Sequence, residues 1–425
     1  MRTPQFMDTR EQIGQQINEA LSSLSDWDNL SDFIPQFHLV WLELGQKVQQ
    51  TLVQQKIEET EAKYQGARTK REKRYYTPLG EMKVKRRVYL TEKGLEIKVD
   101  QELGLPEEKW LPSVLELGCA LGINSEFPNS HRLFTQWTLI KLTEKTLAST
   151  VEKAGRELQE AEFSAEIRES QAVELSGERI YVGVDGVLTP LNQKQGYKEA
   201  KVGVIFWQKE HQKKKGKRGK IRSREYVATL ESREAFRGRV QTLYQQIVKE
   251  KKPQTVVIGD GAHWIWEMAS EQFPNSIEIL DFYHLSEYIW KVAKAGFPNQ
   301  EESQKTWVSQ QLEFLKQSQW KTVITNSHQF RRKGKNLREA IENLEGYLKN
   351  NSTRIDYKSY LKQGLMIGSG VVESSNRRVV TQRLKQAGMH WSKVGAEGVM
   401  ALRAAYLSHS NRWSNFWRTS SSGTN

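Results

Sequence analysis

Residues 255–269 read TVVIGDGAHWIWEMA, a buried-strand pattern that runs into Gly-Asp-Gly and then into a tryptophan-rich helix pattern. A strand that is followed at once by a helix is typical of α/β proteins. Asp260 stands between the two glycines. An Asp-Gly pair is ordinary turn chemistry, but a carboxylate at the end of a buried strand can also be a metal ligand. The rest of the chain is needed to choose between these interpretations.

Further strand patterns surround this stretch. They lie at residues 179–190 (RIYVGVDGVLTP), 199–208 (EAKVGVIFWQ), 224–230 (REYVATL) and 276–281 (SIEILD). A helix is expected over residues 231–250, so three strands in a meander are followed by helix, strand, helix and strand, which predicts a mixed sheet. Residues 284–350 return to helical periodicity, and residues 368–385 (GSGVVESSNRRVVTQRLK) read as a glycine-rich loop that enters a helix.

The first 170 residues are mostly helical in pattern. Residues 10–66 keep apolar side chains at three- and four-residue spacing. Residues 82–99 read as a short hairpin about a turn at Gly94, in which Met82, Val84, Val88 and Leu90 alternate on the first strand and Leu95, Ile97 and Val99 on the second. Residues 131–158 read as helix, tight turn and helix, with Thr143 as the expected N-cap of the second helix. Paired helices of this kind either read DNA or simply build a helical domain, and the pattern leaves both open.

The 425-residue chain carries a net charge of +13, from 64 Lys and Arg against 51 Asp and Glu. The excess is clustered at KREKR (70–74) and KKKGKRGK (213–220), which favours a polyanion such as DNA over a generally basic protein of another kind. No apolar run approaches the roughly 20 residues that span a bilayer, and we expect a cytoplasmic, nucleoid-associated protein without membrane contact. Cys119 is the single cysteine, so it is expected in the core and no internal disulfide can form.

Three acidic residues stand where the predicted sheet would bring them together. Asp185 lies in the first strand, Asp260 ends the fourth, and Glu373 opens the helix after the glycine-rich loop. If those strands are neighbours, both aspartates project at one sheet edge. Clustered carboxylates repel unless cations neutralise them, and oxygen ligands suit Mg²⁺. Two such ions would activate a water or a 3′-hydroxyl in phosphodiester chemistry. The alternative is two turns and a glutamate that stabilises a helix dipole.

Four motifs resemble those of the DDE-type transposases of bacterial insertion sequences, most closely the ISKra-type family. They are YVGVDGV (181–187), VVIGDGAHWIW (256–266), EILDFYHLSEYIW (278–290) and RIDYKSYLKQGLMIGSGVVESSNRRVVTQRLKQAGMHWS (354–392). The resemblance is strong over residues 178–417. It implies a ribonuclease-H-like catalytic fold with a helical insertion, in which Asp185, Asp260 and Glu373 are the catalytic and metal-binding triad. It also implies Mg²⁺, with two ions bound and Mn²⁺ able to substitute.

The resemblance supplies three auxiliary candidates. Asp281 and His284 match an Asp-x-x-His element that would orient a phosphate or a ligand, although a capping aspartate beside a satisfied histidine is the alternative. Trp391 matches a tryptophan that would stack on a flipped or frayed base, or it is core. Relatives carry paired cysteines around the early hairpin, and this chain has none there, so no zinc is expected and the hairpin must be held by packing.

Basic residues near these motifs are candidates for DNA backbone contacts. They are Lys213, Lys214, Lys215, Lys217, Arg218, Lys220, Arg377, Arg378, Arg383 and Lys385. The alternative for the lysine-rich loop is that it is merely solvated.

The sequence thus predicts an α/β catalytic core, a ribonuclease-H-like mixed sheet with a helical insertion, behind a mostly helical DNA-binding region. The regions expected are residues 1–70 (helical), 71–172 (hairpin and helix-turn-helix-like DNA binding), 173–417 (catalytic, with the insertion at about 290–355) and 418–425 (disordered tail). The expected function is metal-dependent cleavage of transposon-end DNA and strand transfer into target DNA, by a homo-oligomer on double-stranded DNA. A domesticated, non-catalytic DNA-binding protein and a structure-specific nuclease of the same fold are the alternatives.

Overall fold

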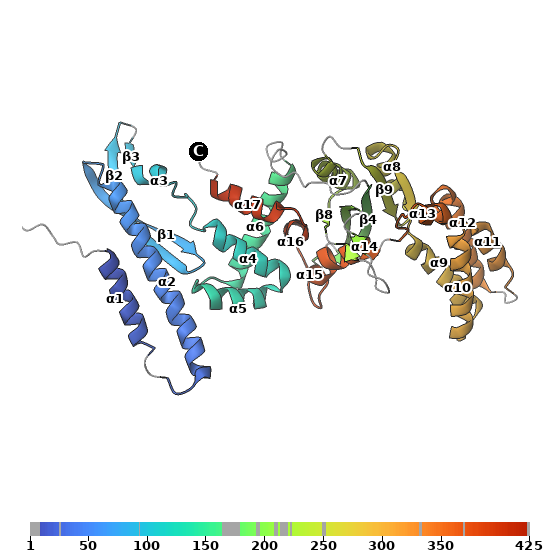
Figure 1. Cartoon of the computed structure of the whole chain (residues 1–425), viewed down its shortest axis with the longest axis horizontal. Helices are drawn as coiled ribbons and strands as arrows, with labels where there is room; N and C mark the ends of the chain where they lie inside the picture. The colour runs from blue at the N-terminus through green and yellow to red at the C-terminus, as the bar shows by residue number, and fades with distance from the viewer. Residues whose placement is uncertain are drawn as a thin grey trace, which may run out of the picture. The chain divides into compact units, whose positions relative to one another are not determined.

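The computed structural model describes residues 9–24, 27–92, 94–163, 179–192, 196–207, 211–212, 220–221, 223–248, 252–330, 334–368 and 370–422. The chain divides into two compact units, each drawn in Figure 1. The N-terminal unit comprises residues 1–154 with 413–425, and the central unit comprises residues 155–412. The four regions expected from the sequence stay a prediction.

The N-terminal unit is mostly helical, with one three-stranded antiparallel sheet in the order β1-β2-β3. Its elements are α1 (Thr9–Ser22), α2 (Leu30–Glu61), β1 (Ala67–Thr77), β2 (Gly80–Thr91), β3 (Gly94–Glu96), α3 (Lys98–Glu102), α4 (Pro112–Asn124), α5 (Phe127–Thr138), the first part of α6 (Glu144–Phe163) and α17 (Arg412–Ser422). The helical periodicity of residues 10–66 therefore forms two helices. The Asn29 side chain caps α2 by accepting a hydrogen bond from the Asp32 amide at 3.1 Å.

Packing holds the early hairpin together, as the absence of cysteines predicts. Ile57 of α2, Tyr75 of β1, Met82 and Val84 of β2 and Val99 of α3 form one buried cluster. Burial of such side chains stabilises by roughly 1.5–3 kcal/mol each.

Two details of the predicted hairpin are wrong. The pairing register of β1 and β2 shifts between Ala67 and Thr69, so Tyr89 is buried beside Val88 and Leu90 faces solvent. A bulge of this kind reverses the inside–outside alternation beyond it. The second strand is also shorter than predicted, because the chain turns into α3 at Lys98.

The predicted pair of helices after residue 127 is confirmed. α5 ends at Leu139, which has a positive φ of 55°, and the Thr143 hydroxyl caps α6 by accepting from the Thr146 amide at 3.1 Å. Cys119 in α4 is buried, as expected.

The central unit contains a five-stranded mixed sheet in the order β10-β9-β4-β5-β8. Its strands and helices are β4 (Arg179–Pro190), β5 (Tyr197–Trp207), β6 (His211–Gln212), β7 (Lys220–Ile221), β8 (Glu225–Thr229), α7 (Arg233–Val248), β9 (Gln254–Gly259), α8 (His263–Gln272), β10 (Ile277–Leu280), α9 (Phe282–Gly296), α10 (Glu301–Lys316), α11 (Trp320–His328), α12 (Lys335–Asn350), η3 (Ser352–Arg354), α13 (Tyr357–Lys362), α14 (Gly370–Asn376), the π-helical turn η4 (Arg377–Thr381), α15 (Gln382–Leu384) and α16 (Lys393–Leu407). β5 runs antiparallel to β4 and β8, whereas β9 runs parallel to β4 and β10. The mixed sheet predicted from the strand order is confirmed.

Helices cover both faces of this sheet. Gly203 of β5 faces Phe236 and Val240 of α7, whereas Gly183 of β4 faces Val372 of α14. Figure 1 shows α7 on one side of the sheet and α14 on the other. Because α14 follows the glycine-rich loop, residues far apart in the sequence meet over β4.

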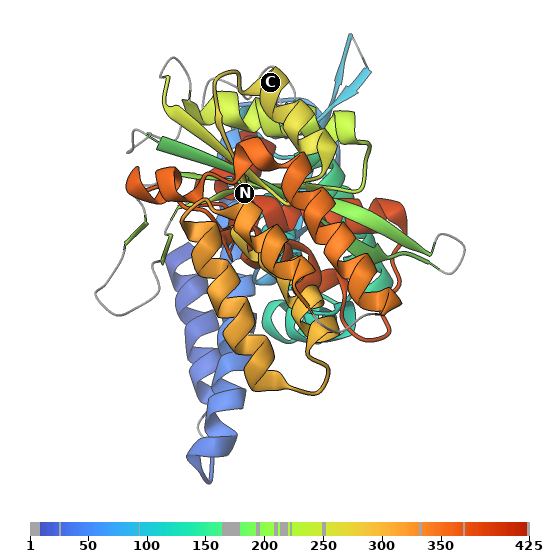
Figure 2. The same ribbon diagram turned by 90° about the vertical axis from the view of Figure 1, so that its right-hand side faces the viewer.

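Four consecutive helices, α9 to α12, form the helical segment after β10. Figure 2 shows these gold-to-orange helices lying next to one another. Leu337, Ile341, Leu344 and Leu348 form the buried stripe of α12, which has the three- and four-residue spacing of an amphipathic helix. The predicted helical periodicity of residues 284–350 is confirmed.

None of the described helices is long and apolar enough to cross a membrane. α17 continues through Ser422, into the tail that was expected to be disordered from residue 418, and residues 423–425 lie outside the described residues.

The backbones of α6 and α16 approach closely at Gly155 and Gly398. A Cβ on Gly155 would overlap the backbone Cα and carbonyl oxygen of Gly398, and backbone cannot yield as a flexible side chain can. We expect Gly155→Ala to lower the free energy of unfolding by about 1–3 kcal/mol in urea denaturation. Gly238→Ala on α7 is the matched control, because a Cβ there meets nothing within 4 Å and the helix gains up to about 1 kcal/mol. Equal effects of the two substitutions would contradict the close approach.

Candidate active site

Asp185 lies within β4, and Asp260 directly follows the neighbouring parallel strand β9. Gly183 of β4 pairs with Ile258 of β9, and each aspartate lies two residues further along its strand direction. The two strands are therefore adjacent, as the predicted carboxylate cluster requires. The charge of Asp260 raises the pKa of Asp185, so the two carboxylates are close enough to repel.

Asp185 is held by two hydrogen bonds. The Gly186 amide donates to Oδ1 at 2.7 Å, and the Asn376 side chain donates to Oδ2 at 2.6 Å. Burial is the main cause that raises the pKa of Asp185 to about 6; Asp260 adds to it, while the Gly186 amide, His284 and Asn376 oppose it. At neutral pH the buried Asp185 carboxylate is therefore charged at a cost in free energy, and a bound cation would reduce that cost.

This environment predicts that Asp185→Asn stabilises the fold at neutral pH. The folded pKa of Asp185 is raised, so its favourable contribution is complete below about pH 4 and is lost as the pH rises through 6. Two pKa units correspond to about 3 kcal/mol, the upper limit of the gain at pH 7.5. Urea denaturation at several pH values should show this gain shrinking towards pH 4. Glu373→Gln, at an exposed carboxylate, controls for removal of a charge. A gain that does not change with pH would show that Asp185 is not desolvated.

The loop after β9 is built around Asp260. Its Oδ1 accepts from the Ala262 amide at 2.9 Å, which forms the turn, and Gly261 takes a positive φ of 94° that favours glycine. The Tyr347 hydroxyl of α12 donates to the backbone carbonyl of Asp260. A Cβ on Gly261 would approach the Tyr347 ring at 2.8 Å. Asp260 therefore both forms the turn and lies beside Asp185 at the edge of the sheet.

Aromatic residues of the helical segment pack beside this edge. Tyr347 stacks on Tyr288 of α9 with ring centroids 4.2 Å apart, and His284 lies edge-on to both rings. Burial, followed by the charge of Asp260, raises the pKa of each tyrosine, so both hydroxyls stay protonated. The helical segment between Asp260 and Glu373 is therefore packed against the loop that carries Asp260.

The Asp281–His284 element has two separate roles in the structure. Asp281 is buried and caps α9 by accepting from the Tyr283 amide at 2.9 Å. His284 is close enough to Asp185 to lower its pKa, against the effect of burial. The capping alternative describes Asp281, whereas His284 lies at the candidate site.

Glu373 is brought beside β4 by α14 but remains exposed. Val372 packs on Gly183, where a Cβ would overlap the valine side chain. Asn376, one turn after Glu373 on the same helix face, reaches Asp185. Asn376 was not among the site residues predicted from the sequence, although its i+3 spacing from Glu373 is visible there.

The fit of these residues to a divalent cation is partial. Within the described ranges, no three of His, Cys, Asp and Glu form a group that could hold a metal ion. Oxygen donors of the right chemistry are nevertheless present in Asp185 and Asp260. The buried Asn376 Oδ1 also accepts no hydrogen bond from the part of the chain that the structure describes.

Two residues assigned to DNA contacts are instead in the core. Arg383 is fully buried, with its guanidinium 4.8 Å from the Trp391 ring centroid, so the prediction that it faces DNA is wrong. Trp391 is buried too, and its indole donates to the Leu384 carbonyl at 3.1 Å. The core alternative for Trp391 therefore fits the structure.

The other basic candidates differ in how far the structure describes them. Arg377, Arg378 and Lys385 are exposed on the segment that follows α14. The π-helical turn there is stabilised by Arg403, which donates to the carbonyl oxygens of Arg378 and Val379. The remaining candidates, Lys213, Lys214, Lys215, Lys217 and Arg218, lie outside the described residues, as does the side chain of Lys220.

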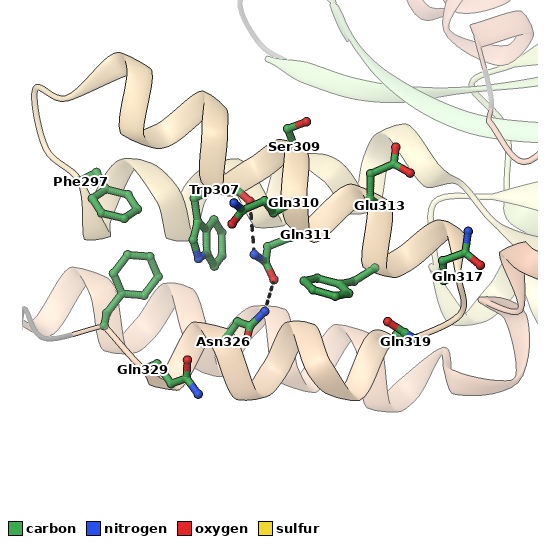
Figure 3. Close-up of a pocket in the computed structure, with 12 residues that line it drawn as sticks. Phe297, Trp307, Ser309, Gln310, Gln311, Glu313, Gln317, Gln319, Asn326 and Gln329 are labelled. Carbon is green, nitrogen blue, oxygen red and sulfur yellow. Dashed lines mark hydrogen bonds between the residues drawn. The ribbon is translucent and has the colours of Figure 1, made fainter.

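A separate cavity of about 840 Å³ lies between α10 and α11 (Figure 3). Aromatic and amide side chains line it, and Gln311 links Trp307 and Asn326 through hydrogen bonds of 3.3 and 3.0 Å. Its lining residues run from Phe297 to Phe330, so it includes none of the three carboxylates. The cavity is therefore not part of the candidate active site.

Fold and site together define an α/β protein with paired aspartates at the carboxyl edge of a mixed sheet. The chain belongs to UPF0236, an uncharacterised protein family whose model matches residues 35–419. A search of curated proteins finds no match.

Proposed function

We propose that this protein is a DDE-type transposase that cleaves transposon-end DNA and transfers the freed 3′-hydroxyl to target DNA. The observation that carries the proposal is the pairing of Asp185 and Asp260 at one sheet edge, with α14 and its Glu373 tethered to Asp185 through Asn376. The mixed sheet, covered by helices on both faces, is consistent with a ribonuclease-H-like core. The four motifs and their order support the same assignment.

Each residue of the site has a role under this proposal. Asp185 and Asp260 would hold divalent magnesium, which manganese can replace, and Glu373 would join them when α14 adjusts around DNA. Bound metal would supply Lewis-acid stabilisation of the phosphodiester and activate the attacking water or hydroxyl. The Gly186 amide and Asn376 keep the Asp185 carboxylate oriented, and Tyr347 fixes the Asp260 loop through its backbone carbonyl.

Charge supports DNA as the substrate. The chain has a net charge of +13, and Arg377, Arg378 and Lys385 are exposed just after the helix that carries Glu373. Phosphate contacts of this kind would set affinity and its salt dependence rather than sequence preference.

The test is an assay on labelled DNA from the sequences that flank the coding region, where the proposal predicts inverted repeats. We expect binding without metal, nicking at the element end only when Mg²⁺ or Mn²⁺ is added, and joined products with target DNA. Binding with no metal-dependent nicking would instead identify a non-catalytic DNA-binding protein. Cleavage of branched DNA without strand joining would identify a structure-specific nuclease.

A further inference from the structure

The first half of α2 exposes an apolar face that no described residue covers. Six large apolar side chains between residues 27 and 41 are each 40–63% exposed, and all of them except Leu39 belong to this face. The five residues of the face are Trp27, Leu30, Ile34, Phe37 and Trp41. The rings of Trp27, Phe33, Phe37 and Trp41 follow one another in that order, with successive centroids 4.9, 5.6 and 6.1 Å apart. We call these five residues the α2 seam.

The spacing of the α2 seam is that of a helix–helix interface. Leu30, Ile34, Phe37 and Trp41 are separated by four, three and four residues, the alternation that keeps a single stripe facing a partner helix. The opposite face of α2 packs on the hairpin, where Ile57 is buried beside Met82 and Val84. α1 lies beside the later part of α2, with the Gln16 amide donating to the Thr51 hydroxyl at 3.1 Å. Among the described residues of its own unit, the seam is therefore the side of α2 without a partner helix.

The charge of this segment excludes DNA as the occupant. Residues 11–46 contain no lysine or arginine, in a chain that has 64, and they contain six acidic residues. A polyanion or an anionic membrane surface would be repelled there. The occupant must therefore be an apolar protein surface.

We propose that the α2 seam binds the same seam of a second copy of this chain, forming a dimer without DNA. A two-fold axis near residues 35–36 would place Ile34 against the partner's Phe37 and Leu30 against the partner's Trp41, so that the two helices run antiparallel. Such an isologous contact closes on itself and leaves no seam exposed.

The buried area is sufficient for a stable dimer. Five half-exposed side chains, two of them tryptophans, present roughly 500 Å² per copy, so two copies bury roughly 1,000 Å², the lower bound for a specific interface. Neighbouring backbone and Phe33 add to this. Centrally placed tryptophan and phenylalanine are also the residues that dominate the energy of interfaces. This inference does not depend on the proposed enzymatic activity.

The test measures the mass of the full chain in solution by sedimentation and light scattering, in nuclease-treated buffer of high salt. We expect twice the chain mass of 49.3 kDa. The double substitution Ile34→Glu with Phe37→Glu should raise the dissociation constant at least about 100-fold, because it would bury unpaired charges. Leu39→Glu is the matched control: Leu39 is 47% exposed on the same helix, but about 140–200° around it from Ile34 and Phe37.

A monomeric wild-type chain, a dimer that survives the double substitution, or a dimer that the Leu39 control also disrupts would each overturn the proposal. Cross-linking provides a second readout should the double variant misfold. A short bismaleimide should join Ile34→Cys to its counterpart in the second copy but should not join Leu39→Cys, which lies on another side of the helix. The native Cys119 should not react, because it is buried. Equal cross-linking at the two positions, or none at residue 34, would equally refute the seam.

Discussion

Asp185→Asn and Asp260→Asn are each expected to reduce metal-dependent cleavage of end DNA by roughly 10³-fold or more, because loss of a metal-binding carboxylate removes several kcal/mol of transition-state stabilisation. Binding of the same DNA should persist, since neither residue supplies a positive charge. Because Asp185→Asn is also expected to stabilise the fold at neutral pH, its loss of activity cannot be attributed to unfolding. The measurements are a gel-shift assay and a cleavage time course on one labelled substrate.

Glu373→Gln tests whether the exposed glutamate takes part in cleavage together with the two aspartates. Glu373 is exposed and forms no three-carboxylate group with the aspartates among the described residues, so its participation requires α14 to adjust around substrate. We expect Glu373→Gln to lose activity to the same extent as the aspartate variants. Glu342→Gln, at an exposed position of α12, is the control and should cleave normally. Full activity of Glu373→Gln beside inactive aspartate variants would remove Glu373 from the site. Activity in all three variants would disprove the proposed function.

The second large effect is expected at Arg412, which is buried in the central unit. Its guanidinium donates to both carboxylate oxygens of Glu162 at 2.6 and 2.7 Å and to the Tyr226 carbonyl at 2.7 Å. Burial raises the pKa of the nearby Glu225, and the charge of Arg412 counteracts that effect. Arg412→Met should therefore lower the free energy of unfolding by about 3–5 kcal/mol, because it leaves Glu162 buried without its partner.

Urea denaturation of two further variants separates this ion pair from simple loss of packing. Arg237→Met removes an ion pair with Glu271 that is largely exposed on the glutamate side, and it should cost no more than about 1 kcal/mol. Combining Arg412→Met with Glu162→Leu should recover much of the loss, since no unpaired charge then remains at residue 162. A double variant no more stable than Arg412→Met alone would contradict the ion-pair explanation.

The strands and helices of the central unit were predictable because each has a strong local pattern. β4, β5, β8, β9 and β10 are runs of β-branched and aromatic residues, and α7 to α12 show clear helical periodicity. The exposure of Leu90 was not predictable, because the β-bulge that moves it depends on pairing between two strands. The same limit applies to the length of the second hairpin strand.

The candidate site was predictable only in part. Asp185 is recognisable as a carboxylate within a buried strand and Asp260 as one at a strand end, and their pairing required only that the two strands be neighbours. Asn376 and Tyr347, which hold the two aspartates, lie 191 and 87 residues away from them in sequence, and no local pattern joins either residue to its aspartate. Arg383 shows the opposite error: its position among basic residues favours DNA contact, yet it is buried against Trp391.

By itself the sequence determined the main strands and helices of the central unit, the positive charge of the chain and the identity of the carboxylates, because these depend on composition and on spacing within one element. Only the tertiary structure decided that Asp185 is desolvated beside Asp260, that Glu373 stays exposed while Asn376 bonds to Asp185, and that no described residue of its own unit covers the α2 seam. Burial and pKa shifts arise from groups brought together across long separations in sequence, and such contacts exist only once the chain has folded.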